Sequence, residues 1–203
     1  MYDIYETEGI ILSSGDIGEA NKIINIFTQD LGLLSATAQS LRQIKSKLRF
    51  GLQNFTLANI SLVRGRDVWR ITNVEYKKNF YKTFFKDKNK MVVVANLGLL
   101  LRKILAGETP DQKLYDTILV AFSFLEREKL SLDEIKDFES VLVVKILYIL
   151  GYFDKHKQIK NQKIYEQVIN QEVWDKSLLE KIRLFNGQII KDINEAFYAT
   201  HLF

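Results

Sequence analysis

The character of this sequence changes near residue 79. From Thr7 to Tyr76 the apolar residues form short runs separated by glycine and polar residues, which is typical of β-strands. After Tyr76 they recur at the spacing of one helical face, apart from a polar segment at 154–171. We therefore expect a two-domain α+β protein, with a β domain over residues 1–78 and an all-α helical domain over residues 79–203 packed on it.

Five strands are expected in the first domain, over residues 8–13, 22–28, 33–38, 55–64 and 68–74, with turns at residues 14–16, 30–32 and 64–67. Between the third and fourth strands, Leu41, Ile44, Leu48 and Leu52 fall on one face of a short amphipathic helix. Five strands with a helix in this place predict an OB-fold β-barrel. Such barrels bind oligonucleotides on strands 2 and 3 and at the loops 1–2 and 4–5.

The second domain is expected to contain at least five helices. Residues 90–105 form the first, and Thr109 is placed to cap the second, with Pro110 at its first position. Ser131 and Glu134 have the spacing of a capping box ahead of a third helix, which ends at Gly151. Residues 175–185 and 189–200 are expected to form two more.

Positive charge is concentrated in one segment of the chain. Residues 42–90 contain thirteen Lys or Arg and three acidic residues, a local charge of 13 − 3 = +10 in a protein whose total is +4. Such a segment is typical of proteins that bind the phosphate backbone of nucleic acids, although a solvated lysine-rich face has the same composition. The candidate phosphate contacts are Arg42, Lys45, Lys47, Arg49, Arg64, Arg66 and Arg70.

Three aromatic residues are interleaved with these cations and are candidates for stacking on bases: Phe50, Trp69 and Tyr76. In a small barrel, however, an aromatic residue of a strand often belongs to the core.

Catalysis, metal binding and membrane insertion have no support in the sequence. There is no cysteine, the two histidines are forty-five residues apart at His156 and His201, and no phosphate-binding glycine loop occurs. The N-terminus is acidic and no apolar run is long enough to span a membrane. We expect a soluble cytoplasmic protein that is not an enzyme, with no cofactor, metal or small-molecule substrate.

An ordered set of short motifs resembles the RecO family of bacterial recombination and repair mediators. In the first sixty residues these motifs are Gly9-Ile10-Ile11-Leu12, Gly18-Glu19-Ala20-Asn21-Lys22, Ile26-Phe27-Thr28, Gly32, Ser46, Leu52-Gln53 and Phe55. In the helical part the resemblance is weaker and consists of Tyr115, Phe138, Leu142, Leu147 and Leu150-Gly151-Tyr152.

The resemblance implies an N-terminal OB barrel followed by a helical domain. It also implies binding to single- and double-stranded DNA, annealing of complementary strands, and help in loading the recombinase at gaps, with association with the nucleoid during repair. The implied partners are RecR and the C-terminal tail of the single-stranded-DNA-binding protein, for which the helical domain is the expected docking site. Many members carry a four-cysteine zinc site after the Leu-Gly-Tyr motif, and residues 153–163 contain no cysteine here.

Two alternatives remain open from the residues. An OB-fold module with a helical appendage is also compatible with RNA binding. The helical half is also compatible with a protein-docking adaptor whose basic segment meets an acidic partner.

Overall fold

The computed structural model describes residues 3–41, 48–66, 68–152, 162–171 and 173–199. The chain divides into two compact units, Met1–Gln112 and Lys113–Phe203, which we call the barrel unit and the helical unit. Strands come first along the chain and helices follow, so the predicted α+β class is confirmed.

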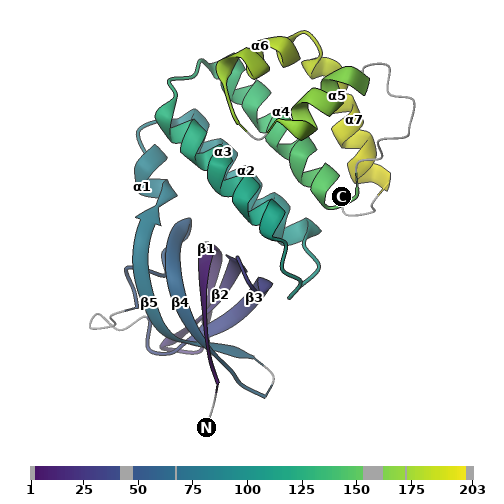
Figure 1. Ribbon diagram of the computed structural model, residues 1–203. Coiled ribbons are helices and arrows are strands. Elements are labelled where there is room, and N and C mark those ends of the chain that lie inside the picture. The colour runs from purple at the N-terminus through teal and green to yellow at the C-terminus, as the bar shows by residue number, and fades with distance from the viewer. Residues whose placement is uncertain (1–2, 42–47, 67, 153–161, 172, 200–203) are drawn as a thin grey trace. The chain divides into compact units, whose positions relative to one another are not determined.

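All five predicted strands are present, and together they form an OB-type barrel. They are β1 (Ile4–Ile17), β2 (Asn21–Thr28), β3 (Gly32–Ala38), β4 (Thr56–Arg64) and β5 (Trp69–Asn79). β1 pairs with β2 and β4, β2 with β3, and β5 with β4, all antiparallel, while β3 and β5 pair in parallel. The order β1-β2-β3-β5-β4 closes the barrel (Figure 1).

β1 is long because it pairs with two neighbours in succession. Residues 4–10 pair with β4, and residues 9–17 pair with β2. The register with β2 shifts between Ile11 and Ser13, and such a bulge bends a strand. The predicted turn at residues 14–16 is wrong, because these residues pair with β2 despite their turn-like composition. The turn lies at residues 18–20, where Gly18 has a φ of +58°.

The barrel interior is filled by alternate residues of the strands. Inward-facing side chains include Ile11, Ile24, Ile26, Leu34, Ala36, Ala58, Ile60, Leu62, Trp69 and Ile71. Leu41 and Leu52 are also buried in this core, and Leu48 packs against it. Residues 48–54 form turns, and the rest of the predicted amphipathic helix, residues 42–47, lies outside the described residues.

Two helices complete the barrel unit, α1 (Phe80–Phe84) and α2 (Lys88–Ile104). Asn79 and Asp87 cap them by accepting hydrogen bonds from backbone N–H groups in the first turn. After α2 the chain is fastened to the barrel, since the Leu33 N–H donates to the Gly107 carbonyl at 3.0 Å. Gly32 permits this approach, because a Cβ there would lie 2.5 Å from the Thr109 carbonyl oxygen.

The helical unit is built from α3 (Gln112–Arg127), α4 (Leu132–Ile149), α5 (Gln162–Asn170), α6 (Lys176–Arg183) and α7 (Asn186–Ala199). The predicted capping box at Ser131 and Glu134 is confirmed, and Gly151 follows α4 with a φ of +76°. α3 begins at Gln112, so the predicted cap at Thr109 is wrong. Phe124, Phe138 and Trp174 pack in the core with ring centroids 4.7–5.9 Å apart.

The change from strand to helix and the division into units fall at different places. β5 ends at Asn79, next to the boundary expected at residues 78 and 79. The compact units divide after Gln112, because α1 lies against β4 and α2 against β1. The first two helices therefore group with the strands.

Candidate nucleic-acid interface

The β4–β5 hairpin carries two of the predicted phosphate contacts, Arg64 and Arg66, and both are exposed. Nη2 of Arg64 lies 3.6 Å from Oε2 of Glu108, and its guanidinium carbon lies 5.2 Å from the centre of the Trp69 ring. Among the described residues, Arg66 has no carboxylate within ion-pair distance. Of the two, Arg66 is therefore the more available to a phosphate.

The prediction that Trp69 stacks on a base needs correction. Trp69 is 4% exposed and belongs to the barrel core. Its indole Nε1–H donates to Oε1 of Glu108 at 2.8 Å, and the ring of Tyr5 meets it edge-on at 5.1 Å. The cause is the alternation of β5, which turns this aromatic residue inward and its neighbour Arg70 outward.

Arg70 lies on the outer surface of the barrel. It is exposed and pairs in register with Thr37 of β3, so it borders the strand face that OB-folds use for oligonucleotides. Tyr76 is 46% exposed, further along the same strand, where it pairs with Ala58 of β4. Its ring remains a candidate for stacking.

Arg49 and Phe50 lie in the turns that follow residue 47, and both are exposed. Arg49 borders a groove of about 640 Å³ in the barrel unit. The other residues lining the groove are Ser14, Asp16, Lys22, Leu41, Leu52, Gln53, Asn54, Phe55, Asn79 and Tyr81. Beside it, Nζ of Lys82 lies 5.3 Å from the centre of the Phe50 ring. This part of the barrel combines cations with exposed aromatic rings, as expected of a surface for single strands.

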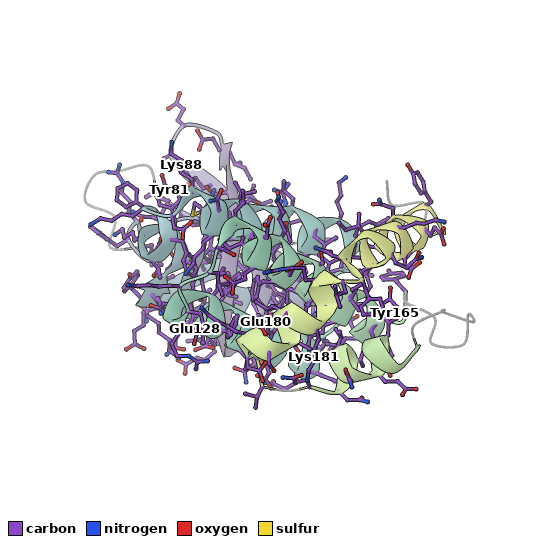
Figure 2. The ribbon with its side chains drawn as sticks, turned by 90° about the horizontal axis from the view of Figure 1, so that it is seen from above. Tyr81, Lys88, Glu128, Tyr165, Glu180 and Lys181 are labelled. Carbon is purple, nitrogen blue, oxygen red and sulfur yellow. The ribbon has the colours of Figure 1, made fainter. Side chains whose placement is uncertain are left out.

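Sequence reasoning missed several exposed residues between the end of β5 and the start of α2, of which Tyr81 lines the groove. Tyr81 and Phe85 are 50% and 59% exposed, and Lys82, Lys86 and Lys88 are exposed as well. Figure 2 labels Tyr81 and Lys88 on the surface of the barrel unit. All five belong to the basic segment 42–90, and the aromatic–lysine alternation within it was the available signal. The predicted contacts Arg42, Lys45 and Lys47 lie outside the described residues.

Acidic residues gather on another part of the barrel. Glu6, Glu8, Asp30 and Glu75 line a second hollow of about 410 Å³, where Lys77 also lies. Lys77 is ion-paired with Glu8, and Asn59 donates to Glu75 at 3.0 Å. Because phosphates are repelled by such a surface, this hollow disfavours a polyanion, unlike the places where the arginines are exposed.

The described residues show no metal site. They contain no group of three or more His, Asp or Glu placed to hold a metal ion. His156 and His201 lie outside the described part of the chain. Among the described helices, none is long and apolar enough to cross a membrane.

Comparison with known proteins agrees with the barrel geometry. Residues 1–80 match the family described as "Recombination protein O N terminal". The chain is 28% identical over 149 residues to "DNA repair protein RecO" of Rubrobacter xylanophilus, covering 73% of this chain and 58% of the relative. It is 30% identical over 147 residues to the protein of that name from Caldanaerobacter subterraneus, covering 72% and 58%.

A third relative with the same printed name, from Thermodesulfovibrio yellowstonii, is 30% identical over 156 residues, covering 75% of this chain and 60% of the relative. The chain therefore matches about three fifths of the length of these relatives. The family match over residues 1–80, the OB-type barrel and the relatives agree, and the chain is similar to the RecO family.

Proposed function

We propose that this chain is a DNA-binding mediator of recombinational repair that anneals complementary single strands and has no catalytic role of its own. The observation that carries the proposal is the distribution of charge on the barrel. Arg66 is exposed at the β4–β5 hairpin, Arg70 on the outer strand face and Arg49 at the groove, while acidic residues line a separate hollow. Contacts of this kind bind any sequence, which annealing of arbitrary strands requires.

The test is salt-titrated binding of an oligothymidylate to the full chain and to two charge-matched variants. One variant carries Arg66→Gln and Arg70→Gln on the barrel unit. The other carries Lys181→Gln and Lys191→Gln, two exposed lysines of the helical unit, the first of which is labelled in Figure 2. Both variants lose two positive charges.

Each phosphate contact on a single strand contributes about 0.7 to the slope of log K against log salt. If both barrel arginines contact phosphates, their loss lowers the slope by about 1.4 and the affinity in ~0.1 M salt by about 25-fold. The helical-unit variant should bind like the unaltered chain. Equal losses of affinity in the two variants would mean that DNA binding depends on net charge and not on the barrel surface. Stronger binding of an RNA competitor than of the oligothymidylate would mean that the ligand is RNA.

We also propose that the helical unit docks the acidic C-terminal tail of the single-stranded-DNA-binding protein. We further propose that this chain binds RecR and helps to load the recombinase. A tail that ends in an apolar side chain and a carboxylate needs an apolar surface beside a cation. α6 supplies Lys181, and Leu184 follows three residues later at 85% exposure. Lys145 is unsuited to this role, because it is 6% exposed and donates to the Gln171 carbonyl.

The same two variants test the docking proposal by calorimetric titration of a tail peptide. The Lys181/Lys191 variant should bind the peptide more weakly, whereas the Arg66/Arg70 variant should bind it normally. The reverse result would place the tail on the barrel, where it would compete with DNA.

A further inference from the structure

The groove beside Arg49 is lined by three separate parts of the barrel unit, among others. Ser14, Asp16 and Lys22 line it from the β1–β2 hairpin, Arg49 and residues 52–55 from the turns before β4, and Tyr81 from α1. Its volume of about 640 Å³ lies within the range of ~300–1,000 Å³ that is typical of small-ligand sites. A duplex does not fit such a volume, but a single nucleotide does.

The floor of the groove is held rigidly. Phe55 has a φ of +62°, a conformation that residues other than glycine rarely adopt, and such residues concentrate at ligand sites. Its N–H donates to the Ile11 carbonyl at 2.7 Å, and its carbonyl accepts from the Phe80 N–H at 2.9 Å. These two hydrogen bonds tie the floor to β1 and to α1.

One buried amide positions two walls of the groove at once. Asn79 is 3% exposed, and its Oδ1 accepts from the Lys82 N–H at 2.9 Å, which caps α1. Its Nδ2 donates to the Asn54 carbonyl at 3.3 Å and to the Thr56 hydroxyl at 2.7 Å. The backbone of Asn54 and the helix that bears Tyr81 are therefore fixed relative to each other.

The side chains at this rigid site remain available to a ligand. Gln53 and Asn54 are exposed, and Tyr81 is 50% exposed. Nζ of Lys22 lies 3.3 Å from Oδ1 of Asp16, so its charge is partly neutralised. Arg49 has no carboxylate within ion-pair distance among the described residues.

These groups match the parts of a nucleotide. An aromatic ring accepts the face of a base, amides bond to its edge, and a guanidinium binds a phosphate. The face of a base is covered by its neighbours in a duplex, so stacking on Tyr81 requires an unpaired base. We infer that the groove captures one unpaired nucleotide, with the base against Tyr81, its edge at Gln53 and Asn54, and its phosphate at Arg49.

This inference rests on the proposed function, because it assigns a subsite within the DNA-binding surface. The test compares the full chain with Tyr81→Ala, Tyr81→Phe and Arg49→Gln in binding an oligothymidylate and an abasic strand with the same phosphates. Tyr198→Ala is the control, since Tyr198 is 74% exposed on α7 of the helical unit. Tyr76→Ala tests the rival exposed ring on β5.

We expect Tyr81→Ala to weaken oligothymidylate binding by about tenfold with an unchanged salt slope, and Tyr81→Phe to bind normally. On the abasic strand, Tyr81→Ala should have no effect. Arg49→Gln should instead lower the slope by about 0.7 on both strands. An oligothymidylate affinity that is unaltered by Tyr81→Ala, or lost only in Tyr76→Ala, overturns the inference while DNA binding itself stands. Failure of the unaltered chain to bind any single strand would instead overturn the proposed function.

Discussion

The described arginines of the barrel unit are exposed, and Lys90 is its one buried charged residue among those described, whereas the helical unit buries two charged residues and bonds them internally. Arg49, Arg66 and Arg70 are exposed on the barrel. In the helical unit, Asp137 is 2% exposed and accepts hydrogen bonds from Nε of Arg183 at 3.1 Å and Nδ2 of Asn186 at 2.6 Å. Lys145, which is 6% exposed, donates to the Gln171 carbonyl and lies 5.7 Å from the centre of the Trp174 ring.

Buried and exposed charged residues therefore have different roles in this protein, the first in packing and the second in ligand binding. A buried charge is costly to desolvate and is tolerated only with partners, so it fixes the packing of the elements that supply them. An exposed arginine contributes little to stability and keeps its donors for a ligand. Substitutions of the buried charges of the helical unit should therefore change the free energy of unfolding, whereas those of the exposed barrel arginines should change the affinity for DNA.

The largest expected effect is that of Asp137→Ala. The substitution leaves the amide of Asn186 and the guanidinium of Arg183 without their acceptor, and we expect a loss of about 3 kcal/mol in the free energy of unfolding. Urea denaturation measures it. Asp133→Ala is the matched control, because Asp133 is an exposed acid of the same helix, 3.5 Å from Lys136, and should cost less than ~1 kcal/mol.

Below the denaturation midpoint, Asp137→Ala should bind single-stranded DNA like the unaltered chain. A loss of DNA affinity in a variant that remains folded would show that the two uses of charge are not separate. Equal destabilisation by the two aspartate substitutions would show that burial does not distinguish them.

How far the sequence predicts these features differs between the two units. Alternation gave the strands of the barrel, because a half-buried strand has a side-chain period of two, and the spacing of Ser131 and Glu134 gave the start of α4. The concentration of Lys and Arg in residues 42–90 also predicted that cations would be exposed on the barrel, because charge is read directly from the sequence. The burial of Trp69 was not predicted, because it depends on the strand register and on the distant Glu108.

Tertiary pairing explains the other differences. Ser14, Gly15 and Asp16 have the composition of a turn, but β2 offers them backbone partners. The network around Asp137 joins residues forty-six and forty-nine positions away, and local periodicity contains no signal for it. The short helix α1 escapes prediction because five residues are too few to show a helical period.

A smaller effect, on the affinity for DNA, is expected from a substitution of Glu108. Among the described arginines predicted to contact phosphates, Arg64 is the one that is paired with a carboxylate, that of Glu108. Glu108→Gln keeps an oxygen that can accept from the Trp69 indole but removes the charge paired with Arg64. Release of Arg64 adds at most one phosphate contact, so affinity for an oligothymidylate in ~0.1 M salt should rise by up to about fivefold. Glu75→Gln is the control, because Glu75 accepts from a neutral partner, Asn59.

The two glutamine variants have the same net charge. If Glu75→Gln raised the affinity equally, the gain would come from net charge and not from the release of Arg64. A salt slope that stays the same in Glu108→Gln would show that Arg64 does not reach a phosphate even when it is free.

The smallest effect concerns an exposed charge that serves structure, the capping box of α4. Oε2 of Glu134 accepts from the Ser131 N–H at 2.6 Å, and the Ser131 hydroxyl accepts from the Glu134 N–H at 3.3 Å. The hydrogen bond from the Ser131 backbone N–H, followed by the Ser131 side chain, holds the pKa of the Glu134 carboxyl group below its ordinary value of 4.5. A carboxyl group with a depressed pKa stabilises the folded state above the pKa of the unfolded chain, and that contribution is lost as the pH falls through the folded-state pKa. The helical unit should therefore lose a little stability below about pH 4.5, by less than the ~1 kcal/mol typical of removing a cap.

Glu134→Gln, compared with the unaltered chain by thermal unfolding between neutral and acid pH, should remove that part of the pH dependence of stability. Because Asp175 caps α6 and its pKa is also lowered, some acid sensitivity should remain in the variant. An acid dependence unchanged by Glu134→Gln would mean that this exposed carboxylate contributes nothing to stability, and that burial alone decides which charges of the helical unit are structural.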